Sequence, residues 1–197
     1  MGNLLKKMAR GMYSTKAEPL KDVAPNFFEL QAKDLQGKVF SFAELKGKKA
    51  FLVVNVASGC QLTNRNYREM NKLYSQYSSK GLEILCFPCN QFYNREPKCD
   101  ADIELFLREH FQPEFKVFGK IDCNGPTAHP VYKYLRSNSV DFKVQKAVPG
   151  GQPQEEYKPI PLTFAKFLLD GNGRVRKYYE PIIYPLSIKD DIEALLN

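Results

Sequence analysis

Several patterns that identify common protein classes are missing from this chain of 197 residues. No apolar run approaches the roughly 20 residues that a membrane-spanning helix needs, so we expect no transmembrane segment. The two histidines, His110 and His129, lack finger-like spacing with the cysteines, and we predict no metal site. The formal net charge is +7, but the basic residues are spread along the chain without a nucleic-acid-binding motif, so we expect no nucleic-acid partner.

The cysteine pattern does not indicate a secreted, disulfide-stapled protein. The five cysteines are Cys60, Cys86, Cys89, Cys99 and Cys123. The number is odd, the chain is too long to depend on disulfides, and no secretory signal precedes them. We therefore predict a cytoplasmic or mitochondrial protein that is not secreted.

The N-terminus is basic and has two interpretations. The first 17 residues contain four Lys or Arg residues and no acid, and their apolar residues recur at helical spacing, as in an organelle transit peptide. The alternative is a disordered tail, because terminal residues are commonly loose. We assign residues 1–23 as a basic tail or transit peptide and residues 24–197 as the folded domain.

The apolar pattern predicts strands that alternate with helices. Residues 49–57 and 82–87 have the character of buried strands, and helical spacing begins at Thr63. Other predicted elements are a short strand at 38–42, a helix with Ile103 and Leu107 on its inner face, a hairpin around 171–173, and a final helix capped by Ser187 and Asp190. The prediction is an α/β fold with a central mixed β-sheet flanked by helices.

Residues 138–161 interrupt this pattern. They are rich in Pro, Gly and charge and show no hydrophobic period. We interpret them as a long loop or insertion, a kind of segment that is often functional or mobile.

Cys60 is the strongest candidate for a reactive residue. It lies in SGCQLTN, after a predicted buried strand and three residues before Thr63, where a helix should begin. Free N–H groups and the helix dipole stabilise a thiolate at such a position, and sites collect at the carboxyl ends of strands in open α/β sheets. The alternative is an inert, buried cysteine, but the polar neighbours argue against burial.

Cys86 and Cys89 have the C-x-x-C spacing of a redox pair. Such a pair acts at the first turn of a helix, whereas Cys86 lies inside a strand-like run and no helix opens at Pro88. We interpret both cysteines as structural. A thiol-disulfide oxidoreductase that uses this pair is therefore an unfavoured alternative.

Separate stretches of the chain resemble, in order, the signature blocks of the glutathione peroxidase family. They are NVASGCQLTNRNY (55–67), GLEILCFPCNQFYNREP (81–97), FGKIDCNG (118–125) with AHPVYKYL (128–135), and TFAKFLLDGNGRVRKYYEP (163–181). The resemblance covers the chain from about Ala24 onward and implies a thioredoxin-like glutathione peroxidase domain in residues 24–197.

The resemblance also implies an activity. A cysteine-type, selenium-independent member would reduce hydrogen peroxide and organic or lipid hydroperoxides at Cys60, in antioxidant defence and the response to oxidative stress. It would need no bound cofactor, because glutathione or thioredoxin serves as the thiol co-substrate.

Further site residues are implied by the same blocks. The family's glutamine matches Gln91, and its usual Trp-Asn-Phe reads Leu162, Thr163, Phe164 here, in a chain without tryptophan. Leu162 has no N–H to donate, whereas Thr163 keeps a hydroxyl. The expected catalytic residues are Cys60, Gln91 and Thr163, and no substrate-binding residue is assigned.

Oxidised Cys60 must be reduced by a second thiol, which belongs either to glutathione or to a resolving cysteine of the chain. Arg108 stands where many cysteine-type members carry a resolving cysteine, and Cys99, in the polar stretch EPKCDAD, is the candidate replacement. The alternative is an incidental surface thiol. A non-catalytic redox sensor or thiol-disulfide relay on the same fold is the alternative function, and the electron donor and oligomeric state stay open.

Overall fold

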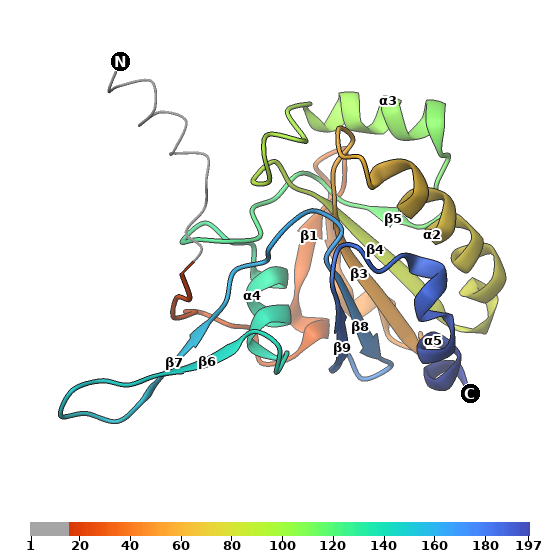
Figure 1. The fold of residues 1–197 in the computed structure, drawn as a ribbon. Helices are drawn as coiled ribbons and strands as arrows, with labels where there is room; N and C mark the ends of the chain where they lie inside the picture. Colours follow the sequence, from red (N-terminus) through yellow and green to blue (C-terminus); the bar gives the residue numbers. More distant parts are fainter. Residues whose placement is uncertain (1–15) are drawn as a thin grey trace, which may run out of the picture.

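A five-stranded mixed sheet forms the centre of the computed structural model, which describes residues 16–197 (Figure 1). Its strands, in spatial order, are β5 (Lys116–Val117), β4 (Leu82–Pro88), β3 (Ala50–Val56), β8 (Lys166–Asp170) and β9 (Val175–Tyr179). β5, β4 and β3 are parallel, and β8 and β9 run antiparallel as a hairpin. The predicted mixed sheet is confirmed, and the full burial of β3 and β4 explains why their sequences are mostly apolar, with Asn55 and Glu83 as the polar exceptions.

Helices cover both faces of this sheet. They are α2 (Thr63–Tyr77), α3 (Asp100–His110), α4 (Pro130–Ser137) and α5 (Lys189–Leu196). Successive side chains of a strand point to opposite faces, so Leu52 and Val54 of β3 pack with α2, α3 and α5, whereas Phe51 and Val53 pack with α4 and the N-terminal segment (Figure 1). None of the helices in residues 16–197 is long and apolar enough to cross a membrane.

Short elements complete the N-terminal half and the connections. They are β1 (Gln31–Lys33), β2 (Val39–Ser41) and the 3₁₀ helices η2 (Phe27–Glu29), η3 (Phe42–Leu45), η4 (Ser78–Lys80) and η5 (Pro185–Ile188). β1 and β2 pair as an antiparallel hairpin, which confirms the strand predicted at 38–42 in a shorter form.

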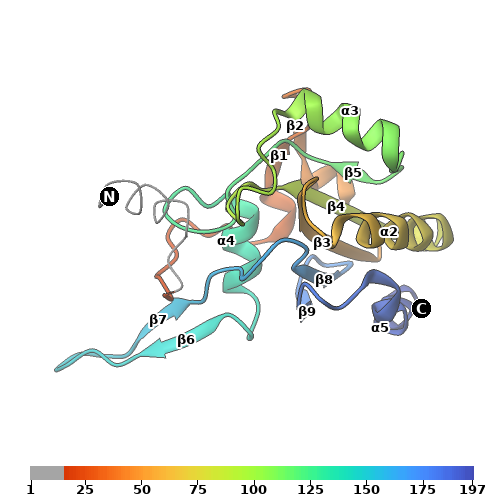
Figure 2. The same cartoon turned by 45° about the horizontal axis from the view of Figure 1, so that its top comes forward.

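The interpretation of residues 138–161 as one long loop is wrong, because they contain two strands, whereas their interpretation as an insertion stays a prediction. β6 (Lys143–Lys146) and β7 (Gln154–Tyr157) pair antiparallel in a two-stranded arm that projects from the body (Figures 1 and 2). Most of its side chains are exposed, and cross-strand ion pairs such as Lys146–Glu156, at 2.7 Å, stabilise it. Because neither face of the arm is mainly buried, its strands carry no apolar alternation for sequence reasoning to detect.

The predicted cap of the last helix is also wrong. Ser187 lies inside η5, where its backbone N–H donates to Tyr184 O, and α5 begins two residues later without a side-chain cap. Pro185 starts the 3₁₀ turn, since its fixed φ suits a first helical position. The apolar face that predicted the final helix is nevertheless correct, because Ile192 and Leu196 are buried.

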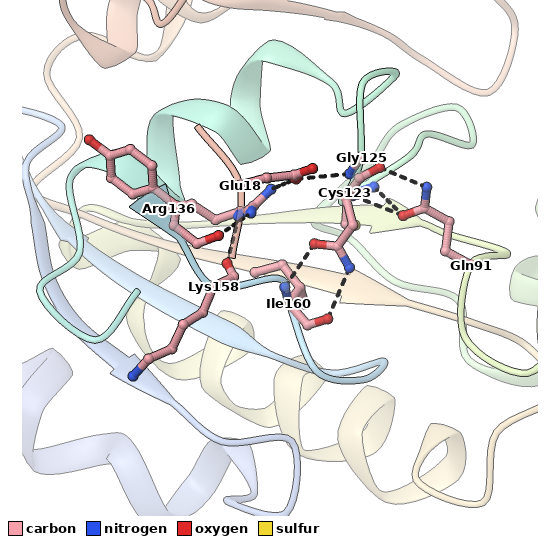
Figure 3. A network of polar contacts seen from close by, with 9 residues as sticks. Glu18, Gln91, Cys123, Gly125, Arg136, Lys158 and Ile160 are labelled. Atoms are coloured by element: carbon pink, nitrogen blue, oxygen red, sulfur yellow. Dashed lines mark hydrogen bonds and ion pairs between the residues drawn. The ribbon is translucent and has the colours of Figure 1, made fainter. Parts of the chain in front are cut away.

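The transit-peptide prediction falls largely on residues 1–15, outside the described part of the chain. Shortly after them, Glu18 forms hydrogen bonds with the domain (Figure 3). Its Oε1 accepts hydrogen bonds from Arg136 Nη1 at 3.0 Å and from the Gly125 N–H at 3.1 Å, and its backbone bridges Tyr157. The domain boundary after residue 23 stays a prediction, but contacts with the domain begin at least five residues before it.

A buried lysine begins β8. The Lys166 side chain is 0% exposed, and its Nζ donates to Phe164 O at 2.7 Å and to Pro181 O at 3.4 Å. Burial lowers the pKa of Lys166 to about 7, although Glu69 and Cys86 oppose that shift. The loop before β8 is thus tied to the loop after β9.

This depressed pKa predicts how stability depends on pH. An unfolded lysine titrates near pH 10.4, so between about pH 7 and 10 the unfolded chain holds a proton that the folded chain has lost. The contribution of Lys166 to the free energy of unfolding therefore rises with pH through this window, and below it the burial cost is fully present. Denaturant unfolding at pH 6, 7.5 and 9 should show wild type gaining stability relative to Lys166→Met as pH rises.

The control for this measurement is Lys72→Met, which removes an exposed lysine of α2. Its stability difference from wild type should not vary with pH. A pH-independent difference for Lys166→Met as well would show that Lys166 is protonated throughout this range.

Candidate active site

Cys60 lies where the sequence predicts it, in the loop between β3 and the start of α2, and it is half-buried. Thr63 fixes this loop: its N–H donates to Cys60 O at 3.1 Å, and its Oγ1 donates to Ala57 O at 2.6 Å. The thiol therefore stands beside the first turn of a 15-residue helix, at the carboxyl end of a central strand. Free N–H groups at such a helix start stabilise negative charge.

Arg95 and Glu96 form a clamp: their hydrogen bonds hold Ser58 and Gly59, the two residues just before Cys60. The Gly59 N–H donates to Arg95 O at 2.9 Å, and Arg95 Nη1 donates to Gly59 O at 3.1 Å. The Glu96 carboxylate accepts from the Ser58 N–H at 2.6 Å and the Ser58 hydroxyl at 2.8 Å. A Cβ at position 59 would lie 2.9 Å from Arg95 O, so only glycine allows this approach.

Glu96 is a buried acid in this clamp. Burial raises its pKa, and hydrogen bonds from Ser58 oppose that shift. Sequence reasoning missed Glu96 and Arg95 as site residues, because they lie over 35 positions from the loop they hold. The only available signal was their place in the block that ends in REP.

Thr163 contacts the thiol directly. Its Oγ1 donates to Cys60 Sγ at 3.2 Å, and the residue is fully buried. The loop that carries it is tied to β3 by Asn55, whose Nδ2 donates to Leu162 O at 3.0 Å and whose carbonyl accepts from the Phe164 N–H at 2.6 Å. The expected proximity of Thr163 and Cys60 is observed.

Backbone strain accompanies this placement. Phe164 has φ 66°, in the left-handed region that bulky residues rarely adopt. Such a conformation costs on the order of 1–3 kcal/mol and persists where surrounding contacts enforce it. Here those contacts are the Asn55 and Lys166 hydrogen bonds to the Phe164 backbone.

The Gln91 side chain hydrogen-bonds to the loop at Cys123 and Asn124, not to the loop that holds Cys60 (Figure 3). Its Oε1 accepts from the N–H groups of Cys123 and Asn124, both at 2.9 Å, and its Nε2 donates to Asn124 O at 3.0 Å. Asn124 in turn exchanges hydrogen bonds with the backbone of Ile160. The hydrogen bonds of residues 16–197 include none between Gln91 and Cys60, so the expected direct contact is not formed in this structure.

The other cysteines occupy distinct environments, and all five are free thiols. Cys86 in β4 is fully buried, and burial raises its pKa. Cys89 and Cys123 are also fully buried; a hydrogen bond from Cys123 lowers the pKa of Cys89, and burial raises the pKa of Cys123. Cys99 is exposed at the start of α3, with its Sγ 3.1 Å from Asp102 Oδ2.

A hollow of about 310 Å³ opens at Cys60 between α2 and α3. Its lining residues are Ser58, Cys60, Thr63, Asn64, Arg68, Phe106, His110 and Phe111. In the part of the chain that the structure describes, no group of His, Cys, Asp and Glu is arranged to hold a metal ion. The arrangement presents a thiol with a hydroxyl donor to a small electrophile that enters the hollow.

Comparison with known proteins identifies the family to which this chain is similar. Residues 27–136 match the family model described as glutathione peroxidase. A probable phospholipid hydroperoxide glutathione peroxidase of Mesembryanthemum crystallinum is 43% identical over 176 residues, covering 89% of this chain and 95% of the relative. The probable glutathione peroxidase 8 of Arabidopsis thaliana is 42% identical over 170 residues, covering 86% and 93%.

Solved structures agree on the fold. GPX1 of T. cruzi superposes with a TM-score of 0.64 at 28% identity, covering 87% of this chain and 96% of that one. A thioredoxin-family thiol:disulfide interchange protein of Chlorobium tepidum, 16% identical, has a TM-score of 0.60 and covers 93% and 99%. The thioredoxin-like fold is confirmed, and the chain belongs to the glutathione peroxidase family.

Proposed function

We propose that this protein is a thiol-dependent peroxidase that reduces hydrogen peroxide and organic or lipid hydroperoxides at Cys60. The observation that carries the proposal is the half-buried Cys60 thiol, which opens into a hollow and accepts a hydrogen bond from Thr163 Oγ1 at 3.2 Å. Relatives named phospholipid hydroperoxide glutathione peroxidase support the lipid substrates.

The first chemical step is an attack by the thiolate. Cys60 Sγ bonds to one peroxide oxygen while the O–O bond breaks, which oxidises the sulfur to a sulfenic acid. The other oxygen leaves with the electron pair and takes a proton to become an alcohol or water. The Thr163 hydroxyl is placed to stabilise the anionic sulfur, and the dipole of α2, which begins three residues after Cys60, favours negative charge there.

The second step consumes a thiol. A thiolate attacks the sulfenic sulfur, an S–S bond forms, and the hydroxyl leaves as water; another thiol then releases Cys60 by exchange. Glutathione or a thioredoxin-like protein is the proposed donor. No bound cofactor enters either step, since the electrons come from the thiols.

The supporting residues take different roles. Thr163 touches the reacting sulfur, whereas Gln91 orders the 123–125 loop through its hydrogen bonds to Cys123 and Asn124. We therefore propose Thr163 as catalytic and Gln91 as a positioning residue. The sensor alternative gains no support, because the thiol opens into a hollow and the relatives carry peroxidase names.

We propose a cytoplasmic or mitochondrial location. A probable mitochondrial relative of Arabidopsis thaliana is 41% identical over 172 residues, and another relative from that plant is named chloroplastic. The mitochondrial relative supports the mitochondrial alternative.

Removing the thiol tests the central assignment. Cys60→Ser should reduce peroxide consumption with either donor to the uncatalysed level, because a hydroxyl is not ionised at neutral pH and is a poor nucleophile. Circular dichroism should show an intact fold. Cys86→Ala, which removes a buried thiol outside the site, is the matched control and should keep its turnover; turnover that survives Cys60→Ser would refute the assignment.

A second variant tests the hydroxyl at position 163. Thr163→Val keeps the shape and removes the donor to Cys60 Sγ, so oxidation of Cys60 by hydrogen peroxide should slow by about 10²-fold. Thr163→Ser restores a hydroxyl and should recover most of the rate. Single-turnover peroxide consumption measures both, and equal rates for Val and Ser would show that the hydrogen bond does not assist the step.

The role of Cys99 can be decided by peptide mapping after one equivalent of peroxide. Cys99 is the only exposed cysteine among the described residues, and it lies three residues after Glu96, which holds the Ser58 loop. We expect a Cys60–Cys99 disulfide, formed after the start of α3 opens, because the two Cα atoms must come within about 7 Å. Cys60 that accumulates as sulfenic acid or a glutathione adduct would exclude Cys99 as the resolving residue.

A further inference from the structure

Two cysteines that the proposed peroxidase cycle does not use are hydrogen-bonded to each other. Cys89, just after β4, and Cys123, in the loop between β5 and α4, are both 0% exposed, and their side chains share a hydrogen bond. Cys86, which completes the C-x-x-C spacing with Cys89, packs in the core on the opposite face of the sheet. The thiol that can pair with Cys89 is therefore Cys123 and not Cys86.

The backbone holds the two segments that carry these cysteines side by side. The Ile121 N–H donates to Pro88 O at 2.9 Å. Gln91 Oε1 joins the segments again, because it accepts from the Cys123 N–H at 2.9 Å and lies 3.8 Å from Cys89 Sγ (Figure 3). Chains paired by backbone hydrogen bonds lie about 4.8 Å apart, within the range of about 4.4–6.8 Å between Cα atoms that a disulfide spans. The pairing thus brings the two cysteines within reach of a disulfide.

The surroundings of the pair differ from those of an inert buried cysteine. A hydrogen bond from Cys123 lowers the pKa of the Cys89 thiol, whereas burial raises the pKa of Cys86, whose sulfur lies 3.9 Å from Met70 Sδ. The hydroxyl of the fully buried Tyr132 interacts with the Cys123 thiol and has no nitrogen or oxygen partner among the described residues. Because the thiolate is the reactive form, Cys89 is the nucleophile of the pair.

A surface loop is all that covers Cys123 on its outer side. Its neighbours Asp122 and Gly125 are partly exposed, and a hollow of about 360 Å³ lies against residues 119–121 and His129. Segments with solvent-exposed backbone open locally at a low cost in free energy. A molecule as small as hydrogen peroxide can therefore reach the pair while the central sheet stays folded.

We propose that Cys89 and Cys123 are a second redox pair, which hydrogen peroxide oxidises to a disulfide that locks the loop between β5 and α4 onto the end of β4. The Cys89 thiolate bonds to one peroxide oxygen while the O–O bond breaks, and the other oxygen leaves and takes a proton to become water. The Cys123 sulfur then attacks the sulfenic sulfur, an S–S bond forms, and the hydroxyl leaves as water with the Cys123 proton. Two thiols and one peroxide become one disulfide and two waters.

This disulfide would close a long segment of the chain that contains α3 and the clamp residues Arg95 and Glu96. A cross-link of this kind stabilises a protein mainly by restricting its unfolded chain. Oxidation of the pair should therefore raise the midpoint of thermal unfolding. The support of the loop before Cys60 would then stay folded when peroxide is abundant.

Peptide mapping of Cys60→Ser tests the pair without the proposed peroxidatic sulfur. The variant is treated with excess hydrogen peroxide, its remaining thiols are alkylated, and the peptides are mapped without reduction. We expect a peptide in which Cys89 is linked to Cys123. Since Cys60 is absent, this outcome does not depend on the proposed function, and recovery of Cys89 and Cys123 as alkylated thiols would show that the proposal is wrong.

Matched variants in the Cys60→Ser background identify the partners. Cys86→Ala, which removes a buried thiol from the other face of the sheet, should keep the link, and Cys123→Ala should lose it. Peroxide treatment should raise the unfolding midpoint of Cys60→Ser relative to the dithiothreitol-reduced protein, and Cys123→Ala should show no such rise. A link from Cys89 to any other cysteine, or an equal rise in Cys123→Ala, would overturn the proposal; if Cys123→Ala does not fold by circular dichroism, the map of Cys86→Ala decides.

Discussion

The position of Thr163 against Cys60 depends on Asn55, a fully buried residue near the end of β3. Cys60 follows β3 and Thr163 precedes β8, and because these neighbouring strands are antiparallel, both loops meet at one edge of the sheet. Asn55 then ties the two loops through its side chain and its backbone carbonyl. This tie, together with the Lys166 hydrogen bond to Phe164 O, holds the left-handed φ of Phe164, and the Thr163 hydroxyl lies against the sulfur.

The central elements could be predicted from sequence, and the peripheral ones could not, for a physical reason. β3 and β4 are covered on both faces, so their sequences are mostly apolar, and α2 buries one face at helical spacing. The arm formed by β6 and β7 is stabilised by backbone pairing and surface ion pairs, which leave no apolar alternation. Its strands therefore looked like a loop.

In the site as well, the features set by neighbouring residues could be predicted, and the features set by contacts between distant segments could not. Cys60 could be placed because strand, loop and helix start follow one another in the chain, whereas Thr163 entered only through the family resemblance. The partners of Gln91 and the clamp by Arg95 and Glu96 depend on contacts between distant segments. The burial of Lys166 could not be predicted either, because the amino-acid sequence does not distinguish a buried lysine from an exposed one.

The hydrogen bonds of Arg136 set a limit on how the N-terminus can be processed. This guanidinium is 0% exposed; it donates to Lys158 O and Tyr157 O, and Glu18 supplies the carboxylate that balances its charge. A protease that cut beyond Glu18 would leave a buried cation without a counter-charge, which is strongly destabilising. A leader removed ahead of Glu18 would spare this pair, so the ion pair marks the latest position at which a mature N-terminus is compatible with the fold.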